Sequence, residues 1–110
     1  MTGNEYQKLA SRTMNHELTE IEQIRHGVFG LCSEAGEVAG IFQKQYQGHL
    51  PTEEHLVKEL GDVLWMVAEI CTANRINLDD VMQANINKLI ERYPDGFDAE
   101  HSLHRKAGDI

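Results

Sequence analysis

Apolar residues recur every three or four positions through most of this chain, which is the spacing of amphipathic helices. The clearest stripes run through residues 21–42 and 56–71. The alternation that marks half-buried strands is absent. The two prolines, Pro51 and Pro94, fall between periodic segments, where they would interrupt no helix. The pattern therefore predicts an all-α fold.

Capping and turn residues divide this pattern into four helices. Asn4 is expected to cap the first helix, and Thr52 the third. Thr19 and Glu22 form a capping-box pattern at the start of the second and longest helix. The fourth helix is expected to follow Asn77. The expected helices cover about residues 4–17, 20–47, 53–74 and 78–92.

The chain has 110 residues, which fits a single domain. We expect a helical domain over residues 1–97 and a polar C-terminal tail over residues 98–110. Apolar positions cover nearly half the circumference of the third helix, so this helix is expected to pack against more than one neighbour. A subunit this small cannot easily cover such a face alone, which predicts a four- to five-helix bundle subunit with an oligomeric core.

Acidic residues dominate the charge of the chain. It contains 18 Asp and Glu against 10 Lys and Arg, which gives a formal net charge of −8. Binding to a nucleic-acid polymer through its backbone needs a basic surface and is not expected. No apolar run has the length of a membrane span, and no secretory signal is visible. We expect a cytoplasmic protein that does not bind membranes.

One short acidic phrase occurs twice. Glu34-Ala-Gly-Glu37 and Glu59-Leu-Gly-Asp62 each place two carboxylates on one helix face, beside the apolar stripe. Packing the two stripes together would bring four carboxylates to the same rim. Such acids are often solvated surface groups, but the matched pair of motifs favours a site for a hard cation, Mg²⁺, Mn²⁺ or Ca²⁺. A di-iron centre is disfavoured because it expects Glu-x-x-His motifs.

These residues resemble the metal motif of the all-α nucleoside triphosphate pyrophosphatases. The segments Leu31–Val38 and Glu59–Trp65 look most like the short MazG-like branch, and so does Lys88–Phe97. The resemblance covers residues from about 5 to 97. It implies cleavage of a (deoxy)nucleoside triphosphate between its α and β phosphates, giving a nucleoside monophosphate and pyrophosphate. Nucleotide-pool sanitation or control of dNTP levels is the implied role.

The resemblance also implies the roles of individual residues. Glu34, Glu37, Glu59 and Asp62 would hold Mg²⁺, with Mn²⁺ as a possible substitute. Position alone suggests that either Glu37 or Glu34 would orient the attacking water. Phosphates would be bound by side chains on one face of the fourth helix, with a further lysine as a weaker candidate. These residues are Lys88, Arg92, Asn85 and Lys44.

Several alternatives stay open at this stage. Lys88 and Arg92 also suit the C-terminal end of a helix for electrostatic reasons alone. The chain could be a regulatory helical module that binds nucleotide or metal without turnover, or could cleave phosphoribosyl-ATP. The base preference, the number of metal ions and the choice between homodimer and homotetramer are not decided by the sequence.

Overall fold

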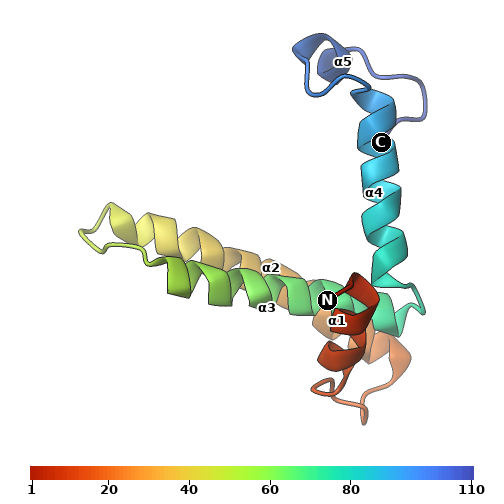
Figure 1. The fold of residues 1–110 in the computed structure, drawn as a ribbon. Helices are drawn as coiled ribbons and strands as arrows, with labels where there is room; N and C mark the ends of the chain where they lie inside the picture. The colour runs from red at the N-terminus through yellow and green to blue at the C-terminus, as the bar shows by residue number, and fades with distance from the viewer.

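The computed structural model describes all 110 residues and contains five helices and no strand, which confirms the all-α prediction. None of the helices is both long and apolar enough to cross a membrane. Figure 1 shows a long helical hairpin with a short helix beside one end and another helix standing away from it. The helices are α1 (Gly3–Ser11), α2 (Glu20–Gln45), α3 (Glu53–Ala73), α4 (Leu78–Arg92) and α5 (Ala99–Leu103).

The hairpin consists of α2 and α3, and local sequence signals fix where both helices begin. The Thr19 hydroxyl accepts a hydrogen bond from the Glu22 backbone N–H at 3.2 Å, and the Thr19 N–H donates to the Glu22 carboxylate at 3.0 Å. The Thr52 hydroxyl accepts from the His55 N–H at 3.1 Å. Both predicted caps are therefore confirmed, because each satisfies a backbone donor that the first helical turn leaves free.

Two glycines allow α2 and α3 to approach closely. A Cβ on Gly27 would lie 2.7 Å from the Ile70 side chain, and one on Gly30 would lie 2.4 Å from the sulfur of Met66. The glycines of the two acidic phrases, Gly36 and Gly61, do not have this role within the chain. Both face open space, since a Cβ at either position would meet no atom within 4 Å.

Gly27→Ala is therefore expected to destabilise the protein, and Gly36→Ala is the matched control. Overpacking a tight contact costs about 1–3 kcal/mol, whereas replacing a helical glycine with alanine gains up to about 1 kcal/mol. We expect a net loss for Gly27→Ala and a small gain for Gly36→Ala, measured by denaturant unfolding. A Gly27→Ala variant as stable as the original protein would contradict the tight contact with Ile70.

The first helix differs from the prediction at both ends. It begins at Gly3, where Thr2 is the N-cap and accepts a hydrogen bond from the Glu5 N–H at 3.0 Å, and it ends at Ser11. Asn4 is not the cap of α1 because its side chain is used elsewhere. The Asn4 Oδ1 accepts from the Asp79 N–H at 3.0 Å, and the Asn4 N–H donates to Asp79 Oδ1 at 3.1 Å.

These contacts let α1 cap the start of α4. The fourth helix begins after Asn77 as predicted, but the Asn77 side chain makes no capping bond. The Gln7 side chain accepts from the Leu78 N–H at 2.7 Å and donates to the Ile76 carbonyl at 2.8 Å. Side chains of α1 thus set the direction in which α4 leaves the hairpin, and the rest of α4 extends away from it (Figure 1).

The chain is open for its size. Its radius of gyration is 17.1 Å, whereas a compact domain of this length has about 13 Å. It exposes 8286 Å², which exceeds the area of a compact 12.5 kDa monomer by about 2,000 Å². Apolar side chains contribute to this exposed area, and several of them lie on α3 and α4. The exposed apolar residues there include Val57, Leu60, Leu64, Val81, Met82, Ile86, Leu89 and Ile90.

The buried core lies where α1 meets the hairpin, and one acidic residue is part of it. Glu69 is 1 % exposed, and its Oε1 lies 2.6 Å from Nδ1 of His26 on α2. The Trp65 indole N–H donates to the Thr13 hydroxyl at 2.9 Å, and its ring meets the His26 ring edge to face. These contacts join α2 and α3 to the segment after α1. Nothing local in the sequence indicates the pairing of His26 with Glu69.

Candidate metal centre and phosphate-binding residues

Three of the four predicted metal-binding acids meet across the hairpin. Glu34 comes from the middle of α2, and Glu59 and Asp62 come from the facing part of α3. One carboxylate oxygen from each of these residues lies within 4.8 Å of the others. Because α2 and α3 run antiparallel with their apolar stripes together, residues at the same offset from each stripe reach the same rim.

The acids repel one another, and little in the chain compensates them. Partial burial raises the pKa of Glu34, and the neighbouring charges of Asp62, Glu59 and Glu37 raise it further. The one side chain paired with the cluster is His55, whose Nε2 lies 3.2 Å from Glu59 Oε1. Carboxylate oxygens without lysine or arginine partners suit a hard divalent cation such as Mg²⁺ or Mn²⁺.

Glu37 lies at the edge of this cluster and not within it. Its side chain is exposed and forms no ion pair, although it is close enough to raise the pKa of Glu34. The open space beside Gly36 and Gly61 lies next to the same acids. The arrangement therefore leaves Glu37 accessible to a solvent molecule or ligand at the rim of the acidic cluster.

Helix α1 borders this rim. Partial burial raises the pKa of the Tyr6 hydroxyl, and the nearby charge of Asp62 raises it further. Trp65, one turn after Asp62, is hydrogen-bonded to Thr13 and is half-buried. Aromatic groups from α1 and α3 thus lie beside the acids.

The predicted phosphate-binding residues lie elsewhere in this chain. Lys88 and Arg92 are on the C-terminal half of α4, beyond the point where α1 contacts this helix. Arg92 forms a two-pronged ion pair with Asp109, at 2.9 and 2.7 Å, and its side chain is 9 % exposed. Asn85 is exposed outside the pocket that Lys88 and Arg92 line, and Lys44 lies exposed in the last turn of α2.

The predicted polar tail contains a short helix, α5, and contacts α4. Asp98 caps α5 through the His101 N–H at 2.9 Å, and residues 104–110 return to α4. His101 pairs with Asp98, and His104 lies 3.5 Å from Glu100, so each histidine has an acidic partner in the tail. Asp109 was not among the predicted residues, because no local pattern links it to Arg92, 17 positions earlier.

Comparisons with known proteins identify the family of this chain. The model of the MazG nucleotide pyrophosphohydrolase domain matches residues 25–97, which include the acidic cluster and most of the helical region. The chain is similar to the Gene 37 protein of Mycobacterium phage L5, with 35 % identity over 96 residues that cover 79 % of this chain and 84 % of that protein. No solved structure matches. The chain belongs to the MazG nucleotide pyrophosphohydrolase family.

Proposed function

We propose that this protein hydrolyses (deoxy)nucleoside triphosphates between the α and β phosphates, releasing a nucleoside monophosphate and pyrophosphate. The observation that carries the proposal is the meeting of Glu34, Glu59 and Asp62 within 4.8 Å on the helical hairpin of a MazG domain. Such a reaction would serve nucleotide-pool sanitation or dNTP control in the cytoplasm.

The proposed cofactor is Mg²⁺, with Mn²⁺ as a substitute, held by Glu34, Glu59 and Asp62 with Glu37 at the edge of the site. When bound, the cation would offset the charge of the phosphates and make a bound water more acidic. The uncompensated charge of these carboxylates and the raised pKa of Glu34 support this assignment, because a divalent cation relieves both.

Glu37 is the residue we propose to orient the attacking water. Its carboxylate is exposed and unpaired, so it can accept a proton from a water at the rim of the cluster. The water oxygen then bonds to the α phosphorus. The bond from this phosphorus to the oxygen that bridges the α and β phosphates breaks, and pyrophosphate leaves with that oxygen. Glu34 fits this role less well because its oxygen lies among the three clustered carboxylates.

We further propose that the active unit is a homodimer or homotetramer in which the partner completes the site. Lys88 and Arg92 are proposed to bind the substrate phosphates, yet α4 extends away from the acids of its own chain. Apolar side chains are exposed on α3 and α4. The excess exposed area of about 2,000 Å² is similar to the area that a stable subunit interface buries. A second copy would cover these faces and bring its α4 toward the acids.

The proposed activity can be tested by incubating the purified protein with Mg²⁺ and each common NTP and dNTP, then separating the products. Monophosphate and pyrophosphate support the proposal and rank the bases. A diphosphate and inorganic phosphate would place the cleavage at a different bond. No turnover in the presence of bound Mg²⁺ would favour a regulatory module that binds nucleotide without hydrolysing it.

A further inference from the structure

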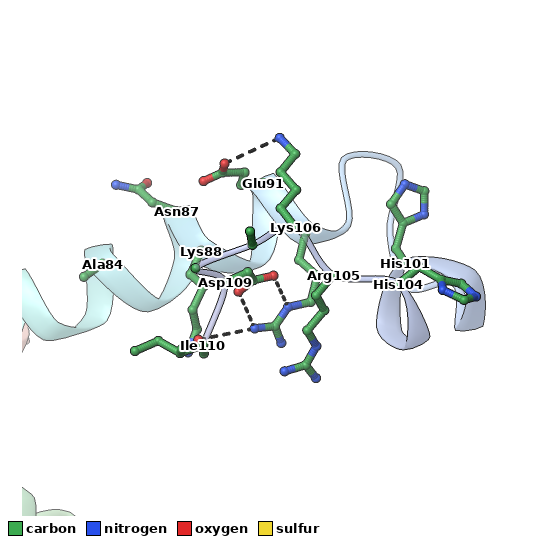
Figure 2. A pocket seen from close by; sticks show the side chains of 13 residues that line it. Ala84, Asn87, Lys88, Glu91, His101, His104, Arg105, Lys106, Asp109 and Ile110 are labelled. Atoms are coloured by element: carbon green, nitrogen blue, oxygen red, sulfur yellow. Dashed lines mark hydrogen bonds and ion pairs between the residues drawn. The ribbon is translucent and has the colours of Figure 1, made fainter.

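A basic pocket lies between the C-terminal half of α4 and the tail. It has a volume of about 560 Å³, and Figure 2 shows side chains from α4 and from residues 101–110 facing one another across it. Four cationic side chains line the pocket, although the whole chain has a net charge of −8. They are Lys88, Arg92, Arg105 and Lys106.

One carboxylate, that of Asp109, lies at the centre of these cations. The Arg92 guanidinium donates to both Asp109 oxygens, which is the two-pronged geometry that arginine also uses for phosphate. Arg92, Arg105 and Lys88 together hold the pKa of Asp109 below its usual value. Glu91 is the other carboxylate that lines the pocket, so four cationic side chains face two acids, and an anion with more charge than Asp109 would match the pocket better.

We propose that this pocket binds a phosphate group, and that Asp109 occupies the position of that phosphate until the ligand displaces it. The ligand class is an anion with several charges, such as the phosphate chain of a nucleotide or free pyrophosphate. The inference deepens the proposed function, since a triphosphate is the anion which that function would bring to Lys88 and Arg92. It adds Arg105 as a further phosphate-binding residue and Asp109 as a built-in competitor.

The local backbone permits this exchange. Gly108, just before Asp109, has φ of 86°, a conformation open mainly to glycine, and the Asp109 N–H closes a short turn onto the Lys106 carbonyl at 3.1 Å. The tail also contacts α4 at Lys106, whose ammonium lies 3.6 Å from the Glu91 carboxylate, and at Ile110, whose carbonyl oxygen accepts from the Arg92 guanidinium at 3.4 Å. Asp109 can therefore leave Arg92 without unfolding α4.

The test measures pyrophosphate binding by calorimetry, without divalent metal and at low ionic strength. Removing the competing carboxylate in Asp109→Asn is expected to tighten binding about tenfold, because one charge-assisted contact no longer has to be displaced. Asp109→Ala should also tighten the binding of pyrophosphate. Asp95→Asn removes an acid from the exposed turn after α4 and is expected to leave the affinity unchanged. Unchanged or weaker binding in both Asp109 variants would overturn the proposal.

Arg105→Gln keeps the Arg92–Asp109 pair and serves as a second variant, in case the Asp109 variants release the tail altogether. It is expected to weaken pyrophosphate binding about threefold or more, and an unchanged affinity would remove Arg105 from the site. Circular dichroism and thermal melting check that each variant is folded. Both results are independent of turnover, so they remain informative if the protein hydrolyses no triphosphate.

Competition identifies the source of the phosphate. A non-hydrolysable triphosphate analogue that excludes pyrophosphate, and itself binds more tightly to Asp109→Asn, assigns the pocket to the substrate. Simultaneous binding of both, with only pyrophosphate affected by Asp109→Asn, assigns it to a separate phosphate ligand. Either pattern supports a phosphate site that Asp109 occupies in the absence of ligand. If Asp109→Asn changes the affinity for neither ligand, the proposal is contradicted.

Discussion

Replacing Glu34 with glutamine is expected to lower the rate of triphosphate hydrolysis by about a hundredfold or more. Substituting a residue that merely supports a metal ligand costs about 10–100-fold, so loss of a proposed ligand should reach at least the upper end of that range. Glu34 is the one acid that α2 contributes to the cluster with Glu59 and Asp62. Glutamine keeps the shape of the side chain but removes the charge that would hold Mg²⁺. Steady-state kinetics at several Mg²⁺ concentrations measures the loss.

The same variant should separate metal binding from folding. A carboxyl group whose pKa is raised in the folded state destabilises that state at neutral pH, where the group is ionised, and this cost disappears as pH falls through the raised pKa. Glu34→Gln is therefore expected to melt at a temperature equal to or above that of the original protein when no metal is present. Its melting temperature should no longer rise with Mg²⁺. In the original protein, Mg²⁺ at about a hundred times its Kd should raise the free energy of unfolding by about 2.7 kcal/mol.

Glu17→Gln provides the matched control, because Glu17 is exposed and lies outside the helices and the acidic cluster. It removes the same charge and should preserve both hydrolysis and the Mg²⁺-dependent rise in melting temperature. If Glu34→Gln kept both properties as well, the acidic cluster would not be the metal centre. If Glu34→Gln were less stable than the original protein in the absence of metal, repulsion among the acids would not be the dominant effect at this position.

Features set by neighbouring residues could be predicted from the sequence. The capping box of Thr19 and Glu22 and the cap at Thr52 depend on bonds within one helical turn, so the starts of α2 and α3 were predicted correctly. The equal offset of the two acidic phrases from their apolar stripes also indicated which residues meet. Glu34, Glu59 and Asp62 do meet in the structure, whereas Glu37 lies outside the group.

Features set by distant residues could not be predicted in this way. Asn4 suits an N-cap as well as Thr2 does, and only its bonds with Asp79, 75 positions away, decide which residue caps α1. The direction of α4 follows from the same tertiary contacts. The Arg92–Asp109 pair has a similar origin, since a single acid in a polar tail gives no local signal of its partner. These long-range contacts separate Lys88 and Arg92 from the acids of their own chain.

A mixture of two inactive variants is therefore expected to regain activity if the site is shared between subunits. In Asp62→Asn the acidic cluster is defective, and in Lys88→Gln the proposed phosphate-binding lysine is missing. Each variant alone should lose about tenfold or more of its activity. In a dimer with a two-fold interface, half the dimers formed by random mixing contain one site with both defects and one with none, so about a quarter of the original activity should return.

A control mixture of Asp62→Asn with Glu34→Gln shows whether the recovery depends on the origin of Lys88. Both substitutions affect acids of the same hairpin, so every cluster in this mixture carries one defect and no activity should return. Mass spectrometry under native conditions establishes that mixed oligomers have formed in both cases. Mixed oligomers of Asp62→Asn and Lys88→Gln that stayed inactive would mean that Lys88 does not act on the partner's acidic cluster. The exposed apolar face of α4 would then serve subunit association alone, and the phosphates would have to be bound by cationic residues nearer the hairpin.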